Sequence, residues 1–326
     1  MLARNAERLY WMSRYLERAE DTARLINSST LVLLDLPAGA SFGWRTLLEV
    51  AGVDDLFQQH YGEADEDAIM RFLIEDEHNP SSVYACVSQA RENCRTLREM
   101  LPAEVWEHIN SLYLYIKAHA GRACRNRRER YLVLNDVIER RHAIVGVVSG
   151  VMGHDLPYQM MKLGRNLERA DMTTRILDLN AAVHYPVEHV LRASLQGRIW
   201  ISILESLSAY PSYRRLVSMD IATDSVVAFL LNDSRFPRSV VHCLVEMEGC
   251  LRELPRSQQL RQQLVQLRQE VGRHPIQGLD TLALHEYLDL LQAQLGMIHA
   301  TLTGSHFHVV QAEPVPEQGA ASLTGQ

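Results

Sequence analysis

Hydrophobic residues recur along most of this chain at the three- and four-residue spacing of amphipathic helices. The first long run of this pattern has its hydrophobic positions at Leu9, Met12, Leu16, Ala19, Ala23 and Ile26. It predicts one helix over residues 3–34, which Asp35-Leu-Pro-Ala-Gly39 ends. The chain shows no convincing alternation of the kind that half-buried strands require. We therefore expect an all-α, multi-helix bundle that includes two similar long charged helices.

Further helices are predicted from the same spacing and from the prolines that interrupt it. They cover about residues 44–52, 64–77, 79–100, 103–128, 131–152, 157–182, 190–208, 212–217, 222–232, 237–254, 256–272 and 278–303. Near His78, Asn79 is the expected helix cap and Pro80 suits the first turn. The most apolar run of the chain is Ala143–Gly153, so we expect the helix over 131–152 to be central and buried.

The pattern predicts a single helical domain over residues 1–303, in which 1–152 and 157–303 are candidate pseudo-duplicated halves. Residues 304–326 turn to Gly, Ser, Pro, Glu and Gln, which predicts a flexible C-terminal tail. The composition agrees with a helical class. Only 17 Gly and 11 Pro occur in 326 residues, which is few for the tight turns of a sandwich or barrel.

Charge and cysteine content narrow the function classes. A net charge of −7 disfavours general nucleic-acid binding. Five cysteines without a C-x-x-C pair indicate reduced, buried thiols in a cytosolic protein. The N-terminus lacks the apolar stretch of a signal peptide, and no apolar run approaches the roughly 20 residues that span a bilayer. We expect a cytoplasmic protein with no nucleic-acid and no membrane partner.

A charged helical segment occurs twice, 151 residues apart. Residues Arg14–Ile26 (RYLERAEDTARLI) agree with Arg165–Leu177 (RNLERADMTTRIL) in eight of thirteen positions, seven of them identical and one an acid in both copies. At about 100° per residue, the charged side chains of each copy form a stripe opposite a hydrophobic stripe. One interpretation is a solvated salt-bridge face on each helix, in which every pair contributes a few tenths of a kcal/mol.

The repetition favours a second hypothesis, in which the two helices face each other. Glu17, Arg18, Glu168 and Arg169 would then line one partly buried polar cleft. Buried charges need partners, and crossed Glu–Arg pairs would supply them.

Candidate binding residues lie on these two charged stripes, or on a third charged helical stretch that could join the cleft. They are Arg14, Glu17, Arg18, Asp21, Arg24, Arg91, Glu92, Arg165, Glu168, Arg169 and Arg175. If the chain is an enzyme, Glu17 and Glu168 are the candidates for acid–base catalysis, with arginine positioning an anionic substrate. A purely structural helical subunit is the third alternative.

At these residues the sequence resembles the alpha-E family, bacterial all-helical domains named for a Glu-Arg motif. The segments that carry the resemblance, in chain order, are Ala3–Trp11, Tyr15–Glu20, Asn79–Val83, Ala90–Asn93, Trp106-Glu107 with Asn110, Leu163–Asp171 and Arg235–Val240. One departure precedes the second Glu-Arg helix. There His154-Asp155 is followed by Leu-Pro-Tyr158, whereas the family has an aromatic residue directly after the pair.

The resemblance implies a cytoplasmic protein encoded beside, or fused to, a circularly permuted ATP-grasp protein and often a transglutaminase-like protease. Such systems make or modify peptides by ATP-dependent amide ligation. The first hypothesis is therefore an accessory protein without independent catalytic activity or a cofactor. It would use the Glu/Arg cleft to bind a peptide, an anionic small molecule or the partner enzyme.

Two other patterns bear on chemistry. Glu75-x-x-His78 and Glu139-x-x-His142 have the spacing of di-iron bundles. Glu75 lies at a predicted helix end, and two arginines crowd Glu139 and His142, so these two residues are only weak metal candidates and no metal is expected. None of the fourteen histidines pairs convincingly at i,i+4 with a second ligand.

The other pattern is a basic run, Arg122–Arg130, with five arginines in nine residues. It is either a solvated helix end or a docking site for an acidic partner or a phosphate. Residues Glu63–Glu77 hold seven acids and could meet this run within the molecule or across an interface.

Overall fold

The computed structural model describes residues 1–35, 43–182 and 189–307. Every regular element in these residues is an α-helix, which confirms the all-α prediction. The helices are α1 (Ala3–Asp35), α2 (Thr46–Ala51), α3 (Asp54–His60), α4 (Glu66–Ile74), α5 (Val83–Arg95), α6 (Ala103–Arg125), α7 (Arg127–Val151), α8 (Leu156–Ala182), α9 (His189–Ser206), α10 (Tyr210–Leu216), α11 (Thr223–Asn232), α12 (Val240–Arg252), α13 (Gln258–Arg273) and α14 (Thr281–His306).

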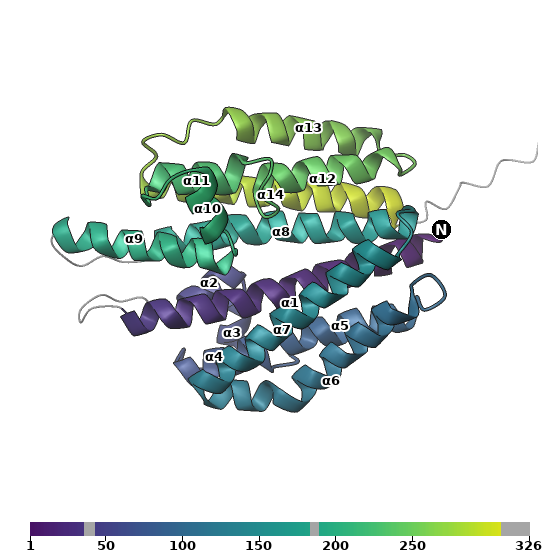
Figure 1. Cartoon of the computed structure of the whole chain (residues 1–326), viewed down its shortest axis with the longest axis horizontal. Coiled ribbons are helices and arrows are strands. Elements are labelled where there is room, and N and C mark those ends of the chain that lie inside the picture. Colours follow the sequence, from purple (N-terminus) through teal and green to yellow (C-terminus); the bar gives the residue numbers. More distant parts are fainter. Residues whose placement is uncertain (36–42, 183–188, 308–326) are drawn as a thin grey trace, which may run out of the picture.

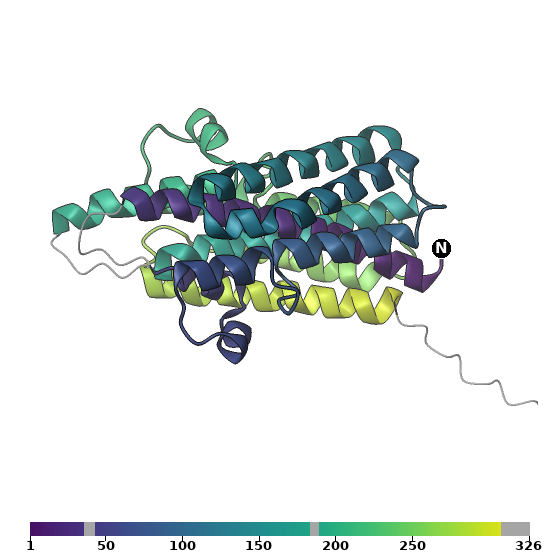
Figure 2. The ribbon, with the colours of Figure 1, turned by 90° about the horizontal axis from the view of Figure 1, so that it is seen from below.

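Helices α1 and α8 lie side by side at the centre of the molecule and run in the same direction (Figure 1). Helix α5 packs on α1, α6 on α5 and α7 on α6, and α7 returns to α1. On the other side, α12 packs on α8, α13 on α12 and α14 on α13, and α14 returns to α8. The view from below shows α14 and α2 on the side of α8 opposite to α7 (Figure 2). The two long charged helices thus form the interface between two groups of helices.

Both faces of α1 are buried. Its hydrophobic stripe, including Leu9 and Met12, is inaccessible to solvent, and so are Glu17 and Asp21 on the charged stripe. A solvated salt-bridge face is therefore the wrong interpretation of the first charged segment. The charged stripe lies against α8 instead of facing water.

The expected central position of the helix over 131–152 is also wrong. In α7, Ala143, Gly146 and Gly150 are exposed and Val151 is 55% exposed. Of this apolar run, Ile144, Val148 and Met152 are buried, because the run faces the core along one edge. The segment is rich in small residues, which count as apolar but have little surface to bury. Its apolar composition was therefore a poor indication of burial.

Several boundaries differ from the prediction. Helix α5 starts at Val83 because the Ser82 hydroxyl caps it by accepting from the Ala85 N–H at 3.0 Å. Asn79 does not cap α5, since its side chain donates to the Phe72 carbonyl at 3.0 Å.

The short helix α3 was not predicted, because only Phe57 of its seven residues is buried and the hydrophobic spacing is lost. Helix α14 continues to His306, so the tail does not begin at 304. Residues 308–326 of the predicted tail lie outside the described residues.

Gly164 allows the close approach of α1 and α8. A Cβ atom added at this glycine would lie 2.4 Å from the Tyr10 carbonyl oxygen of α1. Backbone cannot move away from such a contact as a flexible side chain can, so any side chain here separates the two central helices. The position of Gly164, one residue before the second charged segment, brings the two charged stripes together.

We predict that Gly164→Ala lowers the free energy of unfolding by about 3 kcal/mol, because the added methyl group overpacks the α1–α8 contact. Urea unfolding followed by circular dichroism measures the change. Gly146→Ala is the matched control, since this exposed helical glycine has open space around its Cβ position. It should raise the stability by about 0.5–1 kcal/mol through helix propensity alone. Equal effects of the two substitutions would contradict the role given to Gly164.

Candidate functional site

Two crossed Glu–Arg pairs join the central helices. Glu17 of α1 accepts from the Arg169 Nε of α8 at 2.6 Å. Glu168 of α8 accepts from the Arg18 Nε of α1 at 2.5 Å. Both carboxylates are fully buried. The hypothesis that the two charged helices face each other with crossed pairs is therefore confirmed.

Glu168 is held by two arginines of α1. Its second oxygen accepts from the Arg14 Nε at 2.6 Å and from an Arg18 terminal nitrogen at 3.1 Å. Burial by itself would raise the pKa of Glu168, but the charges of Arg14 and Arg18 outweigh this effect and lower it to about 2. The Arg14 guanidinium also lies 4.9 Å from the Trp11 ring centroid and 3.3 Å from the Tyr10 hydroxyl. The group is an ionised network around a buried carboxylate.

Glu17 is held by three arginines from three different helices or loops. Besides Arg169, an Arg141 terminal nitrogen of α7 lies 2.5 Å from one oxygen, and Arg238, just before α12, lies 3.2 Å from the other. Burial raises the pKa of Glu17, and the charges of Arg169, Arg238 and Arg141 together reverse the shift and lower it. Neither Glu17 nor Glu168 is thus suited to exchange protons near neutral pH.

Arg238 also connects the acids of the next turn of α1. It donates to Asp21 at 2.5 Å and to Glu20 at 2.6 Å. The second oxygen of Asp21 is buried and has no hydrogen-bond partner among the described residues. Burial raises the pKa of Asp21 to about 7, with further raising by Glu17 and Glu20 against the opposing charge of Arg238. Asp21 is the carboxyl group here that titrates near neutral pH, but it has no exposed surface.

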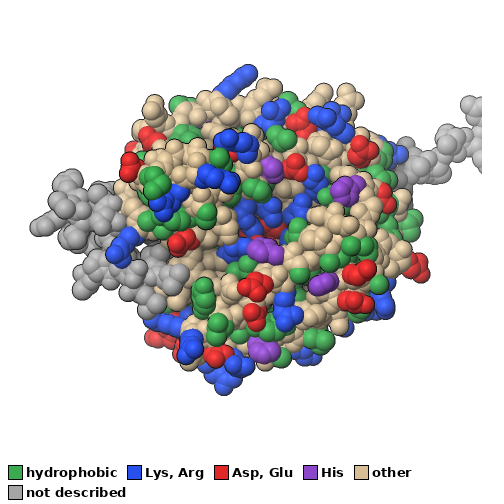
Figure 3. Space-filling model, in the orientation of Figure 1, with side chains coloured by type: hydrophobic (Ala, Val, Ile, Leu, Met, Phe, Trp, Pro, Cys, Tyr) green, Lys and Arg blue, Asp and Glu red, His purple; other side chains and the backbone are tan. Residues whose placement is uncertain are grey.

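Arg165 has no ion partner among the described residues. Its Nε is buried without a hydrogen-bond partner. Burial lowers its pKa, and repulsion by Arg169 and Arg141 lowers it further. We call Arg141, Arg165, Arg169 and Arg238 the central arginine cluster. In Figure 3, basic side chains gather in a recess near the centre of the face, with acidic atoms beneath them.

The charges around this cluster do not balance. Five arginines lie around three carboxylates when the neighbouring Arg24 is included. The arginines are Arg24, Arg141, Arg165, Arg169 and Arg238, and the carboxylates are Glu17, Glu20 and Asp21. The excess is larger when Asp21 is protonated. Arg165 and Arg169 are partly accessible to solvent, whereas the carboxylates are covered. The arrangement is suited to binding an anion at its solvent side.

Arg141, Glu20 and Arg238 were missed as binding candidates. A signal for Arg238 was present, because Pro80-Ser-Ser-Val83 and Pro237-Arg-Ser-Val240 repeat the same pattern before α5 and α12. Ser82 and Ser239 cap the two helices in the same way. The second position of the motif is Ser81 in one copy and Arg238 in the other, so the two sides of the interface differ in charge. No local pattern identifies Arg141, since α7 belongs to neither charged segment.

Some of the predicted binding residues lie apart from the crossed pairs. Arg91 donates to Asn110 at 2.8 Å and stacks on Tyr113 and Trp106, and Glu92 binds Arg91 and Arg95. The expectation that Arg91 and Glu92 join the cleft is wrong, because their part of α5 faces α6 instead of α8.

Arg24 and Arg175, each of which pairs with an acid four residues earlier on its helix, lie closer to the crossed pairs. Arg24 pairs with Glu20 at the edge of the cluster. Arg175 pairs with Asp171 at 2.8 Å. Both therefore flank the interface without touching Glu17 or Glu168.

The weak metal candidates Glu139 and His142 each contact other side chains. His142 lies 3.3 Å from Glu20 and 2.9 Å from a terminal nitrogen of Arg24. Glu139 accepts from Asn135 at 2.9 Å. Among the described residues, Asp178, His285 and Asp289 are the group whose ligand atoms lie close enough together, within 4.8 Å of one another, to share an ion. His285 and Asp289 are an i,i+4 pair 3.7 Å apart, which the search of the sequence for convincing i,i+4 histidine pairs did not single out.

The basic run is partly neutralised inside the molecule. Arg127 and Arg130 both bind Glu66, which belongs to the acidic segment. Arg130 is almost fully buried and also donates to the Ala123 carbonyl at 3.2 Å. The acidic and basic segments therefore meet within the chain. The five cysteines are free and buried, as expected from their spacing.

Comparisons with known proteins give a family and few relatives. The Alpha-E family model, described as a predicted alpha-helical domain with a conserved ER motif, matches residues 1–307. Uncharacterized proteins of Mycobacterium bovis and of two strains of Mycobacterium tuberculosis are each 24% identical over 270 residues, covering 76% of this chain and 29% of each relative. The chain thus spans less than a third of the length of these relatives. No solved structure gives a significant match. None of the described helices is long and apolar enough to cross a membrane.

We predict that Glu168→Gln lowers the free energy of unfolding at pH 7 by about 3–5 kcal/mol, because Arg14 and Arg18 lose their buried partner. The folded pKa of about 2 lies below the ordinary value of about 4.3. The stabilisation by Glu168 is therefore present above pH 5 and is lost as the pH falls toward 2. Urea unfolding at pH 7 and pH 3 measures both effects.

The difference between wild type and Glu168→Gln should shrink as the pH falls. Asp21 acts in the opposite direction, since its raised pKa makes its contribution decline as the pH rises from 4 to 7. Both proteins carry Asp21, so its effect largely cancels in the comparison. Glu107→Gln, at an exposed position of α6, is the control and should change stability little at either pH. A difference that stays constant with pH would contradict the buried pairing of Glu168.

Proposed function

The chain belongs to the Alpha-E family of helical domains, and on this premise we propose that it is an accessory subunit that binds an anionic ligand at the central arginine cluster. The ligand is a carboxylate or phosphate group of a peptide or small molecule. The subunit works with an ATP-grasp amide ligase, and in some systems with a transglutaminase-like protein, in peptide synthesis or modification.

One observation carries the proposed binding role. Arg165 is largely buried beside Arg141 and Arg169, and it has no anionic partner among the described residues. Burying an uncompensated charge costs free energy, and natural proteins retain such costs mainly at functional sites. An anion bound between Arg165 and Arg169 would supply the missing charge with charge-assisted hydrogen bonds.

The geometry favours binding over acid–base catalysis. Glu17 and Glu168 were the candidate catalytic groups, but both are buried, ion-paired and have lowered pKa values. Asp21 has a raised pKa but is fully enclosed. These carboxylates hold the arginines in place, and the arginines present the binding surface. A purely structural subunit is the competing description, and it predicts that Arg165 contributes nothing beyond packing.

The partnership with an ATP-grasp protein rests on the family. The mycobacterial relatives leave more than two thirds of their length outside the match, which agrees with a domain that is joined to other segments. Tyr131 and Leu132, each about 50% exposed, directly follow the basic run and provide an apolar surface beside charged residues. Such a combination suits a docking surface for another protein.

We predict that inorganic phosphate or tri-alanine, which carries a free carboxylate, raises the melting temperature of the wild-type chain in a saturable manner. Arg165→Met should abolish this rise. In the absence of ligand it should also increase the free energy of unfolding by about 1 kcal/mol, because methionine removes the repulsion by Arg141 and Arg169. Differential scanning fluorimetry at constant ionic strength, with KCl as the reference, measures the shifts.

Arg252→Met is the matched control. Arg252 is 65% exposed on α12 and lies 3.7 Å from Glu248, so its removal should leave the ligand response unchanged. A loss of stability in Arg165→Met, or a ligand response equal to wild type, would support the structural subunit instead.

We predict that the chain co-purifies with the circularly permuted ATP-grasp protein of the same genome and increases its peptide-dependent ATP consumption. The measurement is ADP release with and without this chain. Leu132→Asp should weaken the association by introducing charge at the exposed docking surface, while Leu282→Asp, at a more exposed position on α14, should not. The partnership fails if neither association nor a change in ATP consumption occurs.

A further inference from the structure

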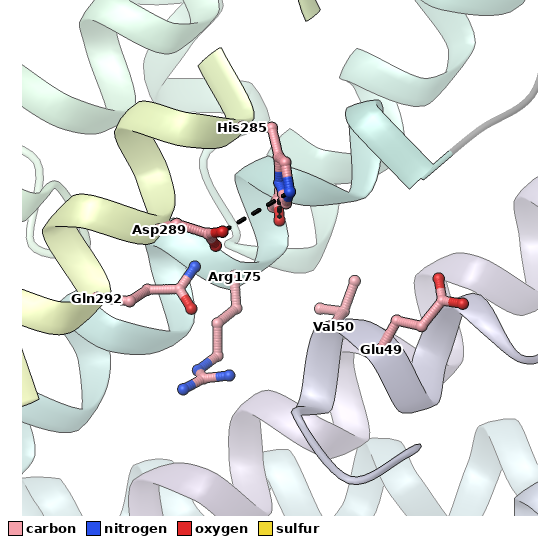
Figure 4. Close-up of a pocket in the computed structure, with 7 residues that line it drawn as sticks. Glu49, Val50, Arg175, His285, Asp289 and Gln292 are labelled. Atoms are coloured by element: carbon pink, nitrogen blue, oxygen red, sulfur yellow. Dashed lines mark hydrogen bonds and ion pairs between the residues drawn. The ribbon is translucent and has the colours of Figure 1, made fainter. Parts of the chain in front are cut away.

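A second polar site lies between α8, α14 and α2, away from the crossed pairs. It is a cavity of about 410 Å³, lined by Glu49, Val50, Arg175, Asp178, His285, Asp289 and Gln292. Figure 4 shows His285 and Asp289 close together on α14, with Arg175 and Gln292 beside Asp289. The lining holds three carboxylates against one guanidinium. Arg175 is already bound to Asp171, so its positive charge is offset outside the group.

The two ring nitrogens of His285 face different carboxylates. Its Nδ1 lies 2.8 and 2.9 Å from the two oxygens of Asp178 on α8. Its Nε2 lies 3.7 Å from an oxygen of Asp289, one helical turn further along α14. One ligand atom from each of the three residues lies within 4.8 Å of the others. The separation of 3.7 Å is close to that of two ligands that share one ion with bonds of 2.0–2.2 Å.

We propose that this cavity binds a divalent transition-metal ion, with His285 Nε2 and Asp289 as its ligands and Asp178 as the group that orients the imidazole. A carboxylate that accepts the Nδ1–H keeps Nε2 unprotonated and aims it at the ion, as in the carboxylate–histidine–metal arrangement. Gln292 follows Asp289 by three residues and lines the same cavity, so its amide oxygen is available as a further ligand. Water fills the remaining positions from the cavity.

The ligand set decides the class of ion. Imidazole with carboxylate suits zinc, cobalt, iron or manganese, whereas magnesium and calcium favour oxygen ligands alone. The exposed side of the site suits an ion that keeps exchangeable positions, since Asp289 is 60% and His285 42% exposed. The proposal does not depend on anion binding at the central arginine cluster, which uses different residues.

Isothermal titration of the full chain, purified without a histidine tag, with Zn²⁺ tests the proposal, and Co²⁺ absorption reports on the ligands. Wild type should bind one ion saturably. His285→Ala and Asp289→Asn should each weaken binding at least tenfold. Asp178→Asn should weaken it about 10- to 100-fold, the range seen when a partner of a metal-bound histidine is removed.

Glu286→Gln is the matched control, because it removes one carboxylate from the same helix next to His285 but outside the metal-binding group. It should bind Zn²⁺ within about twofold of wild type. If His285→Ala does not fold, Asp289→Asn still decides the outcome, since Asp289 is an exposed side chain. The proposal is overturned if wild type shows no saturable one-to-one binding. It is equally overturned if Asp289→Asn binds as wild type does, because the ion then lies on other histidines.

Discussion

The structure depends on the burial of crossed Glu–Arg pairs between two parallel helices. A carboxylate without a partner would be costly in the interior, so each glutamate must meet arginines from the opposite helix. Glu17 finds Arg169 on α8, and Glu168 finds Arg18 on α1. This requirement fixes the register of α1 against α8, and Gly164 allows their backbones to come close enough. The other long helices pack around this charged axis.

The helices on the two sides of this axis are arranged similarly but carry different charges. Ser81 stands before α5 where Arg238 stands before α12. Arg238 and Arg141 both turn to the acids of α1, and Arg165, the counterpart of Arg14, is left without an acid among the described residues. The different charges on the two sides of the axis therefore concentrate positive charge at the central arginine cluster. This difference in charge, more than the motif itself, produces the arginine cluster to which we assign anion binding.

Sequence reasoning located the motif residues more reliably than their environment. The match between the segments at Arg14 and Arg165 identified both crossed pairs correctly. Burial was predicted less well. Hydrophobicity alone placed α7 at the centre, and it takes no account of buried charged groups that neutralise one another. Arg91 and Glu92 were assigned to the cleft on residue type, although aromatic rings of α6 hold Arg91 elsewhere. Arg238 was within reach of a search for repeated helix starts.

The sequence by itself determined the helical class, most helix positions and the family, because hydrophobic spacing, prolines and local motifs act over a few residues. The tertiary structure alone decided which charges are buried together. It brought Arg141 and Arg238 to Glu17 across 124 and more than 200 residues. It also placed Asp178 beside His285, which are 107 residues apart. Contacts of this kind follow from how helices pack around a common axis, and local patterns that mark a residue such as Arg238 do not say which charges it meets.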